Sequence, residues 1–394
     1  MKYDFDTPYD RRHTDSMKWD VAEGELPMWV ADMDFPTAPA VREAVCRRAE
    51  HGIFGYSVLP DAWAEAYVGW WQRRHGFTME KDWLIFTTGV IPAISSAVRK
   101  LTTPAEKVVL MTPVYNIFFN SVLNNGRVVL ESPLLYDGEG YSVDFADLEK
   151  KLSDPQTSLL ILCNPHNPVG KIWDRETLAR IGALCATYHV TVISDEIHCD
   201  LTDPGHDYVP FASVSDTCRD ISVTCLAPTK TFNMAGLQTA AVSVPNPTLR
   251  HKMWRALNTD EVAEPNVFAV PATVAAFTEG DEWLDALRAY IYANKQEAAA
   301  AVRRARFHRA EFQNTKNFLS LPYTFLCEEH GAGIRDENDK RCQEKERGQH
   351  QNPDKGQKQV KTAFEDFLVH SRHLLIIFSS ESSKIAIDKN ELTL

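Results

Sequence analysis

The sequence lacks several features that would place it in a specialised class of protein. Its eight cysteines form no Cys-x-x-Cys pair and no zinc-ligand spacing; they are Cys46, Cys163, Cys185, Cys199, Cys218, Cys225, Cys327 and Cys342. In a chain of 394 residues this pattern is typical of reduced thiols, and it predicts a cytoplasmic protein without a metal site. There is also no basic-then-apolar leader and no apolar run of about 18 residues, so we expect neither secretion nor a membrane span.

Positive charge is scarce as well. The 42 lysines and arginines are outnumbered by 54 aspartates and glutamates, which gives a net charge of −12. A general binder of nucleic acid or of acidic membranes needs a basic face, so we expect neither partner. The length is sufficient for two domains and a large core.

Proline and tryptophan become rare towards the C-terminus. All nine tryptophans precede residue 284, and 19 of the 21 prolines precede residue 272. Residues 331–361 hold 14 charged residues in 31, with Ile334 and Val360 as the only large aliphatic side chains. Such a segment cannot bury enough apolar surface to offset its ordering entropy, which predicts disorder or a solvated loop.

Between about residues 83 and 230 short apolar runs alternate with helical spacing, which predicts parallel βαβ units. The predicted strands are 83–86, 107–111, 127–130, 158–163, 190–194 and 221–226. Helical patterns follow residue 89 and cover 174–189, where Asp174 is the expected N-cap, and a long helix is expected over 281–304. We therefore expect an α/β fold with a mostly parallel central sheet, helices on both faces, and a smaller, incomplete or altered α+β domain.

Polar residues follow three of the predicted strands. Asn164 to Asn167 come after 158–163, Asp195 after 190–194, and Lys230 shortly after 221–226. Taken singly, a turn, a helix cap and a surface lysine are the ordinary interpretations. Ligands of open α/β sheets bind outside the carboxyl ends of the strands, so the three groups are expected to meet at one ligand site.

This combination suits pyridoxal 5′-phosphate (PLP). A lysine amine forms a Schiff base with the cofactor aldehyde, and an acid must face the pyridine nitrogen because the protonated ring acts as an electron sink. Lys230 and Asp195 are the candidates, and Asn167 is the candidate amide donor near the phenolate oxygen. The phosphate needs backbone N–H groups at a helix start. The expected donors are Gly89, Val90 and Ile91, with Pro92 in the first turn.

Eight segments together resemble a known family. They are DRRHTDSMKWD (10–20), LPMWVADMDFPTAPAV (26–41), HGIFGYS (51–57), TTGVIPAIS (87–95), TPVYNIFF (112–119), CNPHNPVGKIW (163–173), SDEIHCDL (194–201) and APTKTFNMAGLQTA (227–240). The chain resembles fold-type I PLP enzymes of the class I/II aminotransferase superfamily. More narrowly, it is similar to the cystathionine β-lyase (C–S lyase) branch of the MalY/PatB type. The resemblance covers roughly residues 3–302.

The resemblance implies a role for each matching residue. Lys230 resembles the Schiff-base lysine that also removes the substrate Cα proton, and Asp195 resembles the pyridinium partner. Asn167 resembles the residue shared by the cofactor O3′ and the substrate carboxylate. Tyr115 resembles the ring stacked on the pyridine, and core packing is its alternative role. Thr229 offers a hydroxyl near the phosphate.

Three further positions follow from the resemblance. Tyr56 resembles the tyrosine that crosses a dimer interface to the partner's phosphate, which implies a homodimer. His198 stands where many aminotransferases place a tyrosine on O3′, and either a cofactor role or a packing role fits it. The segment 29–35 is similar to the N-terminal strand that closes over the substrate, with Ala31 as a substrate-binding residue.

The C-terminal part departs from this pattern. The family's arginine that clamps the substrate α-carboxylate, bidentate and charge-assisted, has no match from about Arg303 onward, and Arg372 stays unassigned. We expect residues 1–45 to pack with the small domain and the active site, 46–280 to form the large PLP-binding domain, and 281–394 to form an atypical small domain. Loss of this clamp would remove positioning of the substrate, which carries much of an enzyme's rate. Cofactor capture is therefore better supported than turnover.

Four functional hypotheses follow. The first is a PLP-dependent C–S β-lyase that acts on cystathionine or another cysteine S-conjugate, a small amino-acid substrate, and yields a thiol, pyruvate and ammonia. The second is an aminotransferase with the same site. The third is a non-catalytic PLP-binding or regulatory protein, and the fourth is an α/β protein without PLP.

Overall fold

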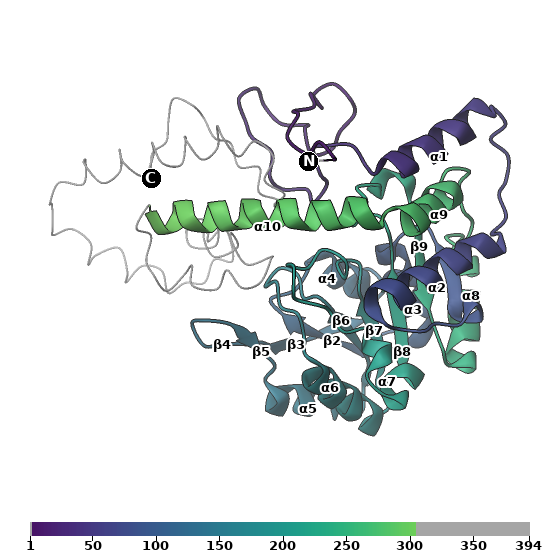
Figure 1. Cartoon of the computed structure of the whole chain (residues 1–394). Helices are drawn as coiled ribbons and strands as arrows, with labels where there is room; N and C mark the ends of the chain where they lie inside the picture. Colours follow the sequence, from purple (N-terminus) through teal and green to yellow (C-terminus); the bar gives the residue numbers. More distant parts are fainter. Residues whose placement is uncertain (1, 305–394) are drawn as a thin grey trace, which may run out of the picture.

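The computed structural model describes residues 2–304 of the chain (Figure 1). The predicted solvated segment 331–361, Arg372 and most of the predicted small domain lie outside the described residues. No helix in the described part is long and apolar enough to cross a membrane.

The fold is built on a seven-stranded sheet with the strand order β1-β9-β8-β7-β6-β2-β3. Its strands are β1 (Leu84–Thr87), β2 (Lys107–Thr112), β3 (Val128–Pro133), β6 (Thr157–Cys163), β7 (Thr191–Asp195), β8 (Ser222–Leu226) and β9 (Ala240–Ser243). Only β9 runs antiparallel to its neighbours, and the remaining pairs are parallel. A small hairpin of β4 (Leu135–Tyr136) and β5 (Tyr141–Ser142) stands apart. The predicted mostly parallel sheet is confirmed.

The helices are α1 (Pro39–Glu50), α2 (Asp61–His75), α3 (Val90–Leu101), α4 (Ile117–Leu123), α5 (Phe145–Leu152), α6 (Arg175–Thr187), α7 (Asp216–Asp220), α8 (Pro247–Thr259), α9 (Ala269–Glu279) and α10 (Asp281–Arg304). Three short 3₁₀ turns are η1 (Lys81–Trp83), η2 (Phe211–Ser213) and η3 (Ala235–Leu237). Asp174 caps α6 as predicted, because its side chain accepts a hydrogen bond from the Thr177 N–H at 2.7 Å. The predicted boundary after residue 45 falls inside α1.

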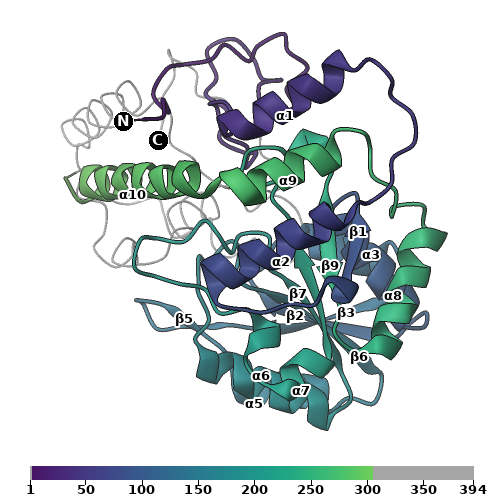
Figure 2. The ribbon, with the colours of Figure 1, turned by 45° about the vertical axis from the view of Figure 1, so that its right-hand side comes forward.

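The continuous apolar run of β6 is explained by burial on both faces of the sheet (Figure 2). Leu159 and Ile161 pack into one core with α3, α4 and α8. Leu160 and Leu162 point the opposite way, into a core with α5 and α6. The strand therefore needs apolar side chains at every position, which is why it was recognisable in the sequence.

A third core joins the β1 edge of the sheet to α2, α9 and the N-terminal segment. It is rich in aromatic rings, and Phe5 reaches it from the N-terminus, 5.7 Å from the Trp283 ring at the start of α10. Nearby, the Tyr290 hydroxyl of α10 donates to Asp6 at 3.0 Å. The beginning and the end of the described chain therefore pack against each other.

Gly280, between α9 and α10, leaves no room for a side chain beside this core. A Cβ at this position would collide with the Ala276 carbonyl oxygen and with the ring of Phe232. We expect Gly280→Ala to lower the free energy of unfolding by about 1–3 kcal/mol, the usual cost of overpacking. The urea midpoint of the cofactor-free protein measures this. The control is Gly140→Ala, where a Cβ has no neighbour within 4 Å; equal midpoints for the two variants would contradict the prediction.

Candidate active site

The carboxyl ends of β6, β7 and β8 lie side by side, as predicted from the polar residues that follow them. Asp195 of β7 is in register with Cys163 of β6 and with Cys225 of β8. Just beyond the strands, the Asn164 N–H donates to the Asp195 carbonyl at 2.9 Å, and the Glu196 N–H donates to the Cys225 carbonyl at 3.1 Å. The three exit loops therefore start from one hydrogen-bonded edge.

Lys230 lies on the turn that follows β8, with its side chain largely enclosed. Its Nζ donates to the Ala31 carbonyl oxygen at 3.5 Å. Burial lowers the pKa of Lys230, and the negative charges of Asp32 and Asp195 act in the opposite direction. The amine is thus placed between the N-terminal segment and the sheet edge, with a larger neutral fraction than an exposed lysine has.

Asp195 is a buried acid beside this amine. One of its carboxylate oxygens accepts the Ile197 N–H at 3.1 Å. Burial raises the pKa of Asp195 to about 7, while the Ile197 N–H and the charge of Lys230 lower it. A carboxylate kept in so dry a place is stable only with a cationic or N–H partner, which a protonated pyridine nitrogen supplies.

Its neighbour Glu196 has a different environment. The carboxylate accepts from the Ser194 hydroxyl at 2.8 Å, the Tyr208 hydroxyl at 3.0 Å and the Phe211 N–H at 2.9 Å. Burial raises the pKa of Glu196 to about 7. Glu196 is therefore saturated by protein donors, which leaves Asp195 as the acid that can face a ligand.

Asn167 lies at the end of β6, next to the same edge. Its backbone N–H donates to the Cys163 sulfur at 3.3 Å. The side chain is buried beside this edge. A buried amide at this edge offers an N–H donor to a ligand oxygen.

His198 is buried beside Lys230 on the loop that follows β7. Its Nδ1 has no hydrogen-bond partner among the described residues. Burial lowers the pKa of His198 to about 3, and the positive charge of Lys230 acts in the same direction. The imidazole is therefore neutral, and its unpaired nitrogen favours the cofactor role over simple packing.

The predicted phosphate donors lie where α3 begins. Gly89 is the N-cap of α3, and no side chain of the described chain caps this helix. The N–H groups of Val90 and Ile91 are therefore available to an anion. A Cβ on Gly89 would lie 3.2 Å from Cδ of Pro92, so a larger residue would crowd this turn.

Tyr115 and Thr229 flank the same region of the sheet. Tyr115 is half-buried just before α4, and its ring meets Phe118 edge to face with the centroids 5.6 Å apart. Thr229, also half-buried, precedes Lys230, and its carbonyl accepts the Met234 N–H at 3.0 Å. Both positions agree with the predicted roles without testing them.

The expectation of a strand over residues 29–35 is wrong, because this segment carries no helix or strand. Its backbone is held by side chains, chiefly Asn233 with Arg11 and Lys18, instead of a neighbouring strand. The Met33 N–H donates to Asn233 Oδ1 at 3.0 Å, and Asn233 Nδ2 donates to the carbonyls of Met33 at 3.0 Å and Phe35 at 2.8 Å. The segment nevertheless lies against Lys230, as Ala31 shows.

Two acids of this segment were not predicted as site residues. Arg11 pairs with Asp32 at 2.7 Å and with Asp34 at 2.8 Å, and Lys18 pairs with Asp34 at 2.6 Å. Asp32 is close enough to Lys230 to raise its pKa. Asp32 and Asn233 both lie within the sequence segments that carry the family resemblance, so proximity in sequence to Ala31 and Lys230 was the available signal.

Tyr56 is the predicted site residue that the single chain does not bring to the others. It lies between α1 and α2 in a segment without helix or strand, and its side chain is fully exposed, at 103%.

Comparison with known proteins identifies the family. The sequence model of aminotransferase class I and II matches residues 26–330, which is more than half of the chain. The chain belongs to this family. Residues 331–394 lie outside the match.

Named relatives narrow the comparison. Cystathionine β-lyase PatB of Bacillus subtilis is 48% identical over 303 residues, which cover 75% of this chain and 78% of PatB. Protein MalY of Escherichia coli is 33% identical over 300 residues, which cover 74% and 76% of the two chains. The relatives thus match the chain over most of their own length.

Solved structures agree with this placement. Cystalysin from Treponema denticola, described as containing PLP, superposes with a TM-score of 0.75 at 31% identity, covering 78% of this chain and 80% of cystalysin. The PLP-bound C–S lyase of Staphylococcus hominis gives a TM-score of 0.73 at 34% identity, covering 78% of each chain. These likenesses confirm the fold-type I architecture and the PLP-dependent class of the chain.

The residues present fit PLP. The enclosed amine of Lys230 lies beside the buried acid Asp195, and the unpaired Nδ1 of His198 provides a further polar contact. The uncapped start of α3 provides N–H groups for a phosphate. Each chemical part of the cofactor therefore has a matching donor or acceptor in this chain.

The raised pKa of Asp195 predicts a pH dependence of the cofactor-free protein. Because the folded protein holds this proton more tightly than the unfolded chain does, the stabilisation is complete below the ordinary pKa of 3.8 and is lost as the pH rises through about 7. We expect Asp195→Asn to flatten the decline of melting temperature between about pH 4 and about pH 7. The change is worth on the order of a few kcal/mol.

Thermal unfolding of cofactor-free wild type and variant across this range is the measurement. Glu196 titrates in both proteins, so the comparison cancels its effect. The exposed Asp207→Asn variant is the control and should follow wild type. A slope in Asp195→Asn as steep as in wild type would contradict the assignment.

Proposed function

We propose that the protein is a PLP-dependent C–S lyase that cleaves cysteine S-conjugates of the cystathionine type to a thiol, pyruvate and ammonia. The observation that carries the proposal is the enclosed amine of Lys230, set between the Ala31 carbonyl and the buried acid Asp195. The 48% identity to cystathionine β-lyase PatB favours elimination over other reactions of the same site.

The residues of the chain divide the work as follows. Bound PLP supplies an electron sink that stabilises negative charge at the substrate Cα. Lys230 takes the Cα proton on Nζ, and its lowered pKa increases the fraction of neutral amine near neutral pH. Asp195 keeps a proton on the pyridine nitrogen by pairing with it, which also relieves the cost of its own burial.

Other residues orient the reactants. We assign the binding of the ring oxygen and the substrate carboxylate to the buried Asn167 amide, and the binding of the phosphate to the uncapped first turn of α3. Loss of the Cα proton and of the β-thiolate breaks the C–S bond with no change of oxidation state overall. Water then releases ammonia from the three-carbon fragment, which leaves pyruvate.

An aminotransferase is the second candidate, because the same lysine and acid serve both reactions and the family carries that name. The two reactions differ in their need for a keto acid. A C–S lyase releases thiol and pyruvate from cystathionine alone, whereas an aminotransferase requires an acceptor keto acid. A protein that binds PLP but turns over neither substrate would support the third, non-catalytic hypothesis.

The first test is of Lys230. Wild type incubated with PLP should show a visible absorption band, and borohydride treatment should leave phosphopyridoxyl on the peptide that contains Lys230. Lys230→Ala should lose both signals and lower lyase turnover by at least about 10³-fold, since it removes both the cofactor attachment and the base. The control is the surface variant Lys252→Ala, which should behave as wild type. Labelling of another lysine in wild type would contradict the assignment.

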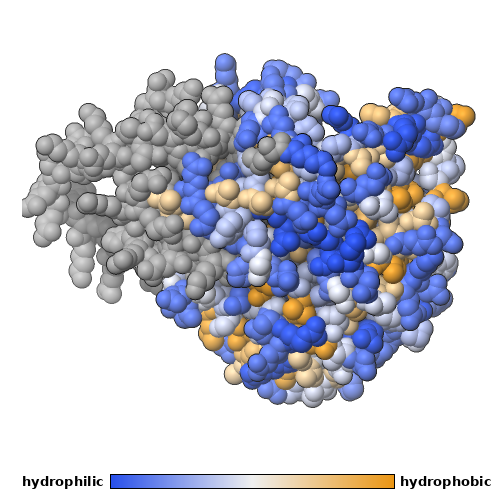
Figure 3. Space-filling view, viewed as in Figure 1, coloured by the Kyte–Doolittle hydropathy of each residue, from blue (hydrophilic) through white to orange (hydrophobic). Residues whose placement is uncertain are grey.

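We also propose that the active unit is a homodimer. The segment that joins α1 and α2 exposes several large apolar side chains, namely Ile53, Phe54, Tyr56, Val58 and Leu59. The right-hand edge of Figure 3, where Figure 1 places this segment, carries several hydrophobic residues. A cluster of this kind is typical of a surface that another protein covers.

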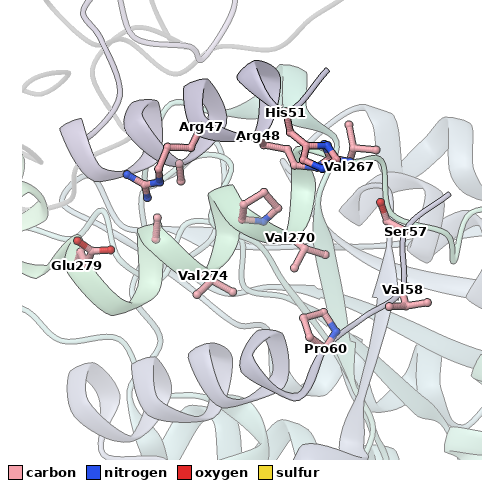
Figure 4. A pocket seen from close by; sticks show the side chains of 13 residues that line it. Arg47, Arg48, His51, Ser57, Val58, Pro60, Val267, Val270, Val274 and Glu279 are labelled. Carbon is pink, nitrogen blue, oxygen red and sulfur yellow. The ribbon is translucent and has the colours of Figure 1, made fainter. Parts of the chain in front are cut away.

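A groove of about 730 Å³ adjoins this segment (Figure 4). Val270 and Val274 of α9 lie along it below Arg47 of α1, while Val58 and Pro60 come from the exposed segment itself. None of the predicted cofactor residues lines it. A second copy of the chain that covered this groove and segment would bury the apolar side chains and let Tyr56 reach across.

Mixed dimers test the role of Tyr56. Lys230→Ala and Tyr56→Ala subunits, each with little activity alone, are co-expressed with different tags. If Tyr56 serves the partner's site, every mixed dimer contains one site with both residues intact. Random pairing should then restore up to about a quarter of wild-type activity. Purified mixed dimers with no activity would show that Tyr56 does not act across the interface.

A further inference from the structure

A buried carboxylate, Asp200, joins the two loops that carry the candidate cofactor residues. It lies on the loop after β7, beyond Asp195 and His198, and it is only 3% exposed. Two backbone bonds fold this loop, from the Cys199 N–H to the Glu196 carbonyl and from the Leu201 N–H to the His198 carbonyl, each 3.1 Å. Asp200 is therefore fixed relative to Asp195.

Three donors from two other parts of the chain converge on Asp200. From α2, the Trp70 indole N–H donates to both carboxylate oxygens at 3.1 and 3.2 Å, and His75 Nε2 contacts Oδ1 at 2.9 Å. From the turn after β8, the Thr231 hydroxyl donates to Oδ2 at 2.9 Å. Although burial raises the pKa of Asp200, the contacts with His75, Thr231 and Trp70 outweigh it and hold the pKa below its usual value.

Thr231 is the residue that follows Lys230, and its side chain is fully buried. The turn around the two residues is closed by the Phe232 N–H, which donates to the Pro228 carbonyl at 2.9 Å, and by the Met234 N–H, which donates to the Thr229 carbonyl at 3.0 Å. With the Thr231 side chain bonded to Asp200 on the buried side, the turn has a fixed orientation when Lys230 extends towards the site.

We propose that Asp200 is a positioning residue that holds the Lys230 turn through the Thr231 hydroxyl, so that the amine keeps its place relative to Asp195. A hydrogen bond to a buried carboxylate is stronger than one between neutral groups, which makes this contact a firm attachment. The kinetic part of the proposal rests on the proposed lyase function, while the structural part concerns the turn itself.

The contact set has one competing interpretation. His75, Cys199 and Asp200 are grouped closely enough to hold a metal ion. However, His75 already contacts Asp200, burial raises the pKa of the Cys199 thiol, and Trp70 and Thr231 occupy both oxygens of Asp200. Hydrogen bonds account for the His75 Nε2 atom and for both oxygens of Asp200, so the attachment of Thr231 to Asp200 is the better explanation.

The decisive variant is Thr231→Val, which removes the hydroxyl but keeps the branched shape. Asp200 retains Trp70 and His75 as partners, so no buried charge is stranded and the fold is preserved. Thr231→Ser restores the hydroxyl. The matched control is Thr273→Val, which removes another fully buried hydroxyl whose partner is the neutral Thr239 hydroxyl at 3.0 Å.

Hydrogen exchange of the cofactor-free proteins measures the turn directly. We expect the peptide over 226–237 to exchange about 10-fold faster in Thr231→Val, with wild-type rates in Thr231→Ser and Thr273→Val. With PLP bound, kcat for the C–S lyase reaction should fall about 10- to 100-fold in Thr231→Val while KM changes little, because misplaced catalytic groups lower the rate more than substrate affinity. Thr231→Ser should recover most of the lost kcat.

Two results would overturn the proposal. One is wild-type exchange and kcat in Thr231→Val; the other is a stoichiometric metal ion in the purified protein that is lost in a His75→Ala variant. If wild type binds PLP but cleaves no thioether, the proposed function fails. The difference in hydrogen exchange between Thr231→Val and Thr231→Ser then still tests whether Asp200 holds the turn through Thr231.

Discussion

The whole arrangement depends on keeping a lysine amine and a carboxylate together in a place that water hardly reaches. Burial acts against both charges, as the lowered pKa of Lys230 and the raised pKa of Asp195 show. Parallel strands solve this problem, because their carboxyl ends present side chains from neighbouring loops at one edge while the strands below remain apolar. A ligand that carries both an N–H and an anionic group offsets this cost of burial.

Around this edge the loops are fastened by side chains rather than by further strands. Glu196 accepts four protein donors, Asn233 holds the backbone of the N-terminal segment, and Asp200 joins the loop after β7 to the turn after β8. On the far side of the same loop, Lys295 of α10 forms a buried ion pair with Asp203 at 2.6 Å. These side-chain contacts hold the loops of the site in place without additional strands.

The sequence was sufficient to predict the sheet and the meeting of its polar ends. Strands such as β6 are apolar throughout, so the polar residues that follow them are easy to recognise in the sequence. β9 was not predicted because Ala240–Ser243 is short and built of small residues. The contacts of Asn233 and Asp200 were not predicted, because their partners lie far away in sequence and no local pattern encodes such a contact. The role proposed for Tyr56 depends on a second chain, which one sequence cannot place.

The contact between Asn233 and Met33 joins residues 200 positions apart. During synthesis from the N-terminus, the segment that covers Lys230 leaves the ribosome long before the lysine does, and its backbone must remain solvated until Asn233 emerges. β1 likewise has no neighbouring strand until β9 has been synthesised. The site is therefore among the last parts of the fold to form, and a nascent chain released early would carry the finished central strands without a closed binding site.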